Sequence, residues 1–242
     1  MIQPYVVGLH LGPAFAPSAI VLVRRTAGAT ERDPVTHCVA AARRWPAGTR
    51  YEVMMPLVTR VLDRGGWREG VVALVANVTG VPAAAVGLVD RIAGPVRFEA
   101  TRVTTGDHAE EKADGWRVPQ RDLVGVLQLL LGQQRLKLPD TLPETPALMA
   151  QIHAFGVVAP GRPSSDRYAT APGSHDGLVT ALALACWFGE CITPAQIEEG
   201  LSEFSAWSRD ALLFEHGKRR IGRKRAPRGG PSEGSQLLDG LS

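Results

Sequence analysis

The sequence predicts an α/β fold in which a mixed five-stranded sheet is flanked by helices, and three observations predict it. Short apolar runs of strand length recur through the first half of the chain. Segments with apolar residues at helical spacing alternate with the later runs. A strongly apolar, alanine-rich segment follows at residues 174–188, as expected of a helix that packs closely against a sheet.

The first elements are three strands and a helix. Residues 5–12 and 19–23 are predicted to form a hairpin, and residues 35–45 a weaker third strand that ends before Pro46. Apolar side chains then recur at helical spacing over residues 51–64, until two glycines stop the helix. The order at this point is strand, strand, strand, helix.

The middle of the chain alternates strands and helices. Residues 71–76 are a continuous apolar run, typical of a strand buried on both faces of a sheet. Pro82 suits the first turn of a helix over residues 83–92, and residues 95–103 alternate as in a half-exposed strand. The polar stretch from there to Trp116 is predicted to be a mobile loop.

Helices and a tail complete the predicted order. Pro119 opens a helix with Asp122 in its first turn, where a carboxylate complements the helix dipole. Ser174 is the expected N-cap of the long apolar helix, with Asp176 in its first turn. The remaining expectations are a helix at 145–155, a loop or ragged hairpin at 156–173, a short amphipathic helix at 194–207 and disorder beyond Glu215.

Composition restricts the class of protein. The chain of 242 residues is long enough for one well-cored domain with an appendage, so we expect a domain at 1–190, a helical extension at 191–215 and a tail at 216–242. Nothing resembles a membrane span or a signal peptide, which predicts a cytoplasmic protein without a membrane partner. The three cysteines lack a zinc-binding spacing and are expected to be free thiols.

The net charge of +3 is unevenly distributed. A near-neutral body is followed by a short basic segment, which suggests an electrostatic contact with DNA or another polyanion, although a solubilising tail has the same composition. The basic residues of this tail include Lys218, Arg219, Arg220, Arg223, Lys224, Arg225 and Arg228.

Three of the predicted elements have a polar residue at one end. His10 lies near the end of the first strand, Asn77 follows the fourth strand, and Asp176 lies at the start of the apolar helix. The order of strands and helices resembles that of the ribonuclease H-like fold, and this resemblance implies catalytic groups at such positions. These three residues are therefore the candidate catalytic and metal-binding residues.

The chain resembles the C-terminal nuclease domain of phage terminase large subunits, in a stand-alone or phage-derived form. Four segments in the right order carry this resemblance over residues 5–190: residues 8–12 with 17–21 behind them, 74–81, 118–125 and 175–179. No phosphate loop of the G-x-x-x-x-G-K-[ST] kind occurs, so the packaging motor is not in this chain. The resemblance implies a relation to DNA packaging, with DNA and phage packaging proteins as partners.

In such domains a cluster of carboxylates holds a pair of divalent ions that cleave DNA. Mapped onto this chain, the first-strand acid falls on His10, the fourth-strand acid on Asn77, and the late-helix acids on Asp176 and Gly177. Only Asp176 keeps its carboxylate. Hard ions such as magnesium prefer oxygen ligands, so this set of residues predicts at most one weakly bound divalent ion, manganese or magnesium.

The sequence therefore predicts a terminase-nuclease-like pseudoenzyme with impaired or lost cleavage. The alternative is an active metal-dependent endonuclease with an altered His10, Asn77 and Asp176 site, helped by acids of the 104–116 loop. Each residue also has a purely structural interpretation: a hydrogen-bonded histidine, a turn asparagine and a first-turn acid. An actin-like ATPase or sugar kinase and a junction resolvase share parts of this pattern, but the former needs a second glycine-rich turn, for which residues 79–82 are a poor candidate.

Overall fold

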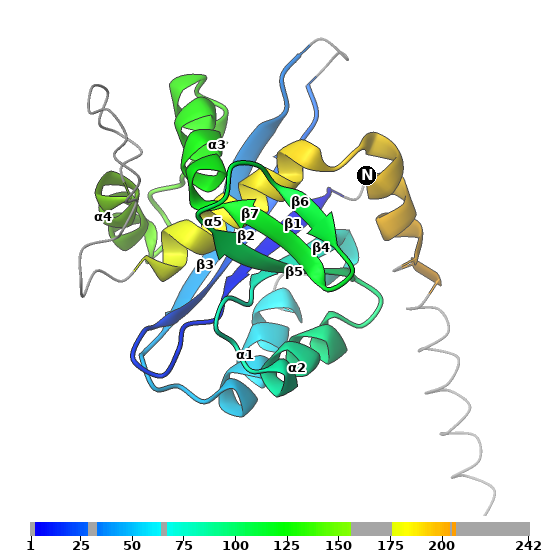
Figure 1. Cartoon of the computed structure of the whole chain (residues 1–242). Coiled ribbons are helices and arrows are strands. Elements are labelled where there is room, and N and C mark those ends of the chain that lie inside the picture. The colour runs from blue at the N-terminus through cyan, green and yellow to red at the C-terminus, as the bar shows by residue number, and fades with distance from the viewer. Residues whose placement is uncertain (1–2, 29–32, 64–66, 156–175, 204, 207–242) are drawn as a thin grey trace, which may run out of the picture. The chain divides into compact units, whose positions relative to one another are not determined.

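A single mixed sheet is the centre of the fold. The computed structural model describes residues 3–28, 33–63, 67–155, 176–203 and 205–206, and the chain from Met1 to Ser205 forms one compact unit. Eight strands lie in the order β6-β7-β5-β4-β1-β2-β3-β8 (Figure 1). They are β1 (Tyr5–His10), β2 (Ser18–Thr26), β3 (Thr36–Trp45), β4 (Val71–Asn77), β5 (Arg97–Thr104), β6 (Glu110–Lys112), β7 (Gly115–Pro119) and β8 (Leu136–Lys137).

Strand direction determines which strand ends meet. Strands β1, β4, β5 and β7 are mutually parallel neighbours, whereas β2 runs antiparallel to both β1 and β3. The carboxyl ends of β1, β4, β5 and β7 therefore lie along one edge of the sheet. His10 and Asn77 are the last residues of β1 and β4, so both stand at this edge.

Helices cover the two faces of the sheet and enclose two cores (Figure 1). One core joins the sheet to α3, α4 and α5, and the other joins it to α1 and α2. The helix bounds are α1 (Tyr51–Asp63), α2 (Ala83–Ala93), α3 (Gln120–Gly132), α4 (Thr145–Ala154) and α5 (Gly177–Cys191), followed by a helix at Pro194–Glu203.

Helix α5 packs unusually close to the sheet because small residues line the contact. It lies against β1, β2 and β4, and its residues from Gly177 to Gly189 are buried. A Cβ atom added to Gly8 would lie 1.8 Å from the Ala181 carbonyl oxygen, so only glycine fits there. The prediction that the alanines of this helix allow close packing is consistent with this contact.

The five predicted strands are β1 to β5, and the sheet is wider than five strands. The predicted mobile loop before Trp116 is wrong in part, because Glu110–Lys112 and Gly115–Pro119 pair as the antiparallel hairpin β6–β7. All residues of strand β6 are exposed, so its sequence lacks the alternation of apolar and polar residues that would predict a strand. The predicted N-cap Ser174 is also wrong, because Asp176 occupies the N-cap position of α5 and the helix begins at Gly177.

Other expectations concern cysteines, membranes and the tail. Cys38, Cys186 and Cys191 are free, as predicted. Within the described residues no single helix is long and apolar enough to cross a bilayer; α5 and the helix Pro194–Glu203 meet that test only as a pair, bent by 110° at their junction. The predicted loop at 156–173, residues 207–215 and the basic tail lie outside the described residues.

Candidate functional site

The structure brings His10, Asn77 and Asp176 together at one edge of the sheet. His10 and Asn77 are paired in register across the parallel strands β1 and β4. Helix α5 begins directly over them: a Cβ atom on Gly177 would lie 3.2 Å from the His10 ring carbon Cδ2. Asp176, the residue before Gly177, interacts electrostatically with His10. The convergence expected of a site is therefore present, while the roles of the three residues stay predictions.

A chain of hydrogen bonds joins two of these residues to the backbone. The Thr79 backbone N–H donates to Asn77 Oδ1 at 3.0 Å. Asn77 Nδ2 lies 3.2 Å from His10 Nδ1. Because a backbone N–H can only donate, the Asn77 oxygen must face Thr79 and the amide NH₂ must face His10. The contact is an Asx turn, as predicted for Asn77, with its amide nitrogen directed at the histidine.

This arrangement fixes the tautomer of His10. An Asn77 NH₂ donor requires His10 Nδ1 to accept, which places the single ring proton of a neutral imidazole on Nε2. Burial lowers the pKa of His10 below its usual value of 6.5, and the neighbouring Asp176 carboxylate offsets part of that effect. Burial and hydrogen bonding thus both favour the neutral ring.

The donor set does not fit a divalent metal centre. Asp176 is the one carboxylate among the three residues, while Asn77 Oδ1 accepts from Thr79 and His10 Nδ1 accepts from Asn77. Metal binding through His10 Nε2 would move the ring proton to Nδ1, where it would face the Asn77 NH₂ group. No group of three or more His, Cys, Asp or Glu side chains within the described part of the chain is arranged to hold a metal ion.

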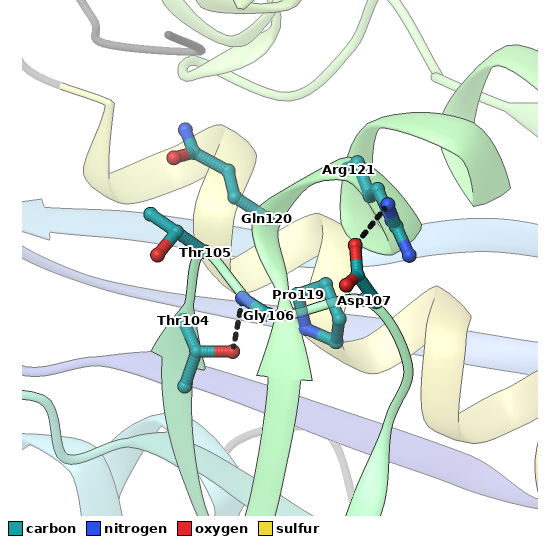
Figure 2. A pocket seen from close by; sticks show the side chains of 7 residues that line it. All are labelled: Thr104, Thr105, Gly106, Asp107, Pro119, Gln120 and Arg121. Atoms are coloured by element: carbon teal, nitrogen blue, oxygen red, sulfur yellow. Dashed lines mark hydrogen bonds and ion pairs between the residues drawn. The ribbon is translucent and has the colours of Figure 1, made fainter. Parts of the chain in front are cut away.

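Two acids of the 104–116 segment are paired with neighbouring cations. Asp107 forms an ion pair with Arg121 at 3.0 Å, and Glu110 pairs with Lys112 at 3.0 Å. Asp107 and Arg121 line a cavity of about 350 Å³ at the carboxyl ends of β5 and β7 and the start of α3 (Figure 2). Thr104 also lines it, and its hydroxyl accepts a hydrogen bond from Gly106 N–H at 3.4 Å. The charges at the start of α3 are thus paired locally.

Sequence reasoning missed a second polar cluster between β3, β8 and α5. His37 is fully buried, and its Nε2 lies 2.7 Å from Glu190 Oε1. Arg135 donates to both Glu190 oxygens at 2.7 and 2.8 Å and also to the Val35 carbonyl. Burial lowers the pKa of His37, while hydrogen bonds from His37 and Arg135 hold the pKa of Glu190 below its usual value despite partial burial. Residues 153 positions apart meet here, so no local pattern could reveal the pair.

Comparison with known proteins gives the fold and no sequence family. No protein-family model matches the sequence, and no curated protein matches it. The large terminase nuclease of thermophilic phage G20c with bound magnesium superposes with a TM-score of 0.52 and 16% identity over 76% of this chain and 80% of that one. A second structure of that nuclease gives a TM-score of 0.50 and 16% identity over 76% and 81% of the two chains.

A third similar structure is the human cytomegalovirus terminase nuclease domain soaked with manganese. It gives a TM-score of 0.49 and 10% identity over 77% of this chain and 84% of that one. The two phage G20c structures are 16% identical to this chain in sequence, so their structural similarity establishes the fold alone. The fold is that of ribonuclease H-like nucleases. More particularly, it is the fold of terminase nuclease domains, which confirms the resemblance drawn from the sequence at the level of the fold.

Proposed function

We propose that this chain is a terminase-nuclease-like protein related to DNA packaging, which associates with DNA and has impaired or lost metal-dependent cleavage. One observation carries the proposal: Thr79 N–H, Asn77 and His10 form a hydrogen-bond chain at the two positions to which the family resemblance assigns metal-binding carboxylates. This contact is complete without a cation. Asp176 alone retains the carboxylate that the family resemblance assigns to the site.

The charge argument supports lost cleavage. A pair of divalent ions brings four positive charges into one pocket, and at about 4 Å each unit-charge contact is worth about 4 kcal/mol when the effective dielectric is near 20. Neutral His10 and Asn77 supply no such charge, and Gly177 supplies no side chain. The affinity for a second ion therefore falls by several orders of magnitude relative to a full carboxylate set.

Three features support DNA as the partner. The fold is shared with nucleases that act in terminases, and the residues from Lys218 to Arg228 give the chain a basic segment suited to phosphate contacts. The edge that carries His10 and Asn77 is also the edge where parallel strands end, which is where α/β proteins usually place their ligands. Phage packaging proteins are the further partners that this function implies.

Plasmid cleavage tests the proposal. Supercoiled plasmid is incubated with the full chain and magnesium or manganese, beside an Asp176→Ala variant. We expect no nicking above the level of D176A, and a gel shift of the plasmid with both proteins. Robust cutting by the natural chain that D176A abolishes would instead establish the alternative, an active endonuclease that uses His10, Asn77 and Asp176.

A further inference from the structure

The loop between β1 and β2 is held rigidly. Gly12 N–H donates to Ser18 Oγ at 3.0 Å, and the Tyr51 hydroxyl donates to the Gly12 carbonyl at 3.0 Å. A turn bond from Ala16 N–H to the Pro13 carbonyl, at 2.9 Å, closes the tip. These three bonds fix a loop that carries an aromatic residue at its tip.

That residue, Phe15, is the most exposed large hydrophobic side chain among the described residues. It is 82% exposed, whereas the next, Val53 on α1, is 57% exposed. Burial of an aromatic ring normally stabilises a fold. Because the Phe15 ring lies in water, it adds little hydrophobic stabilisation to this one. A single exposed apolar residue is ordinary on a protein surface, but three hydrogen bonds hold this loop, so less ordering is needed when a partner contacts the ring.

The loop adjoins the candidate site. It leaves β1 at His10 and returns under the start of α5, where the Pro17 carbonyl oxygen lies 3.2 Å from the position that a Gly177 Cβ would take. On the other side, Ala14 lies beside the turn that follows β3, since its carbonyl oxygen is 3.8 Å from a Cβ built on Gly48. Phe15 is therefore displayed between the His10 edge and the end of β3.

Pro17 of this loop lines a cavity together with one arginine, and a second arginine precedes Tyr51 in the sequence. The cavity, about 370 Å³, is lined by Pro17, Arg44, Trp45, Pro46, Ala47 and Glu144, and its volume falls in the range of small-ligand pockets. Arg44 pairs with Ala19, which itself pairs with His10, so these residues form one row across three strands. Arg50 is 79% exposed and precedes Tyr51, which anchors the loop.

Both arginines can exchange their present partners for phosphate. Arg44 lies 2.8 Å from Glu144, and Arg50 lies 3.5 Å from Glu52. The arginine side chains of these pairs are 41% and 79% exposed, and exposed ion pairs contribute little to stability. A guanidinium binds phosphate oxygens with the same paired geometry that it uses for carboxylates.

We propose that the 11–17 loop and the adjacent cavity form a contact for an unpaired nucleotide of DNA, in which Phe15 stacks on the base. Arg44 and Arg50 contact the flanking phosphates. This inference rests on the proposed association with DNA and specifies the part of the DNA that the loop binds. Stacking on an aromatic ring tolerates any base, so the contact selects unpaired over paired nucleotides and not one sequence over another.

The test uses a short single strand containing 2-aminopurine, whose fluorescence falls when it stacks, and the matching duplex. The full chain is compared with F15A, F15W and the control V53A, which removes an exposed apolar side chain on α1. We expect F15A to lose the quenching and about tenfold of the single-strand affinity, while F15W and V53A keep both. Duplex affinity should change less than twofold in all variants, because paired bases do not reach the ring.

The outcomes separate this inference from the proposed function. If the natural chain binds DNA and F15A quenches and binds as V53A does, the stacking contact is overturned and DNA association stands. If the natural chain binds neither strand form, both are overturned. Thermal melting of F15A checks its fold, and retention of quenching by F15W shows that an aromatic ring, and not the native backbone alone, produces the signal.

Discussion

The double variant H10D/N77D is expected to bind manganese at least a hundredfold more tightly than the natural chain. It places two carboxylates at the ends of β1 and β4, where the two positions are directly paired, beside the existing Asp176. Three carboxylates at one strand edge repel one another until a divalent ion joins them, and each contact with the ion is worth several kcal/mol at an effective dielectric near 20. The hydrogen bond between positions 10 and 77 is lost in the same step.

Isothermal titration with manganese measures this gain, and thermal melting with and without the ion checks it independently. Ion binding to the folded state alone raises the melting temperature by mass action, so only H10D/N77D should melt higher in manganese. The control is H10N, which has nearly the shape of H10D and no added charge. Equal manganese affinity in H10D/N77D and H10N would mean that these positions do not form a latent metal site.

The variant E190A is expected to destabilise the fold by about 2 kcal/mol, because two buried side chains lose their hydrogen-bond acceptor. It removes the shared acceptor of His37 and Arg135, whose side chains are 0% and 10% exposed. The Arg135 charge is then left without its carboxylate. The buried His37 ring also loses the partner of its Nε2 atom. Because its Nδ1 atom has no hydrogen-bond partner among the described residues, neither ring nitrogen is then hydrogen-bonded.

Urea unfolding measures this loss against a matched control, E144A. That variant removes an ion pair whose arginine is 41% exposed, so its expected effect is below about 1 kcal/mol. E190Q should fall between the two, because a neutral amide still accepts hydrogen bonds from His37 and Arg135. Equal midpoints for E190A and E144A would show that the His37, Arg135 and Glu190 cluster does not stabilise the fold.

Much of the fold was predictable because its central strands and helices are apolar in regular patterns. The run at 71–76 predicted β4, and apolar residues at helical spacing predicted α1 and α3. The pattern is less exact within elements: Val53 is one of the apolar residues at helical spacing in α1, but it is 57% exposed. The hairpin β6–β7 escaped prediction because an exposed, three-residue strand at a sheet edge has no apolar signature.

The candidate site was predictable as a location and not as a set of contacts. The family resemblance selected His10, Asn77 and Asp176, and the structure brings them together, yet the bond between Asn77 and His10 depends on the register of β1 against β4. That register arises from long-range pairing, which a single sequence does not reveal. The same reason hid the His37 and Glu190 contact and the proximity of Gly177 to the histidine ring.

His10 and Asn77 form a hydrogen-bonded contact that is complete without a metal ion. Nitrogen-15 NMR of the histidine rings examines this contact, with the His10 signals assigned by comparison with H10Q. At pH 7.5 we expect a neutral His10 with its proton on Nε2 and a bare Nδ1, unchanged by millimolar magnesium or zinc. A proton on Nδ1, or a His10 signal that shifts saturably with either ion, would show that His10 does not accept from Asn77 in this way or that it binds a metal ion.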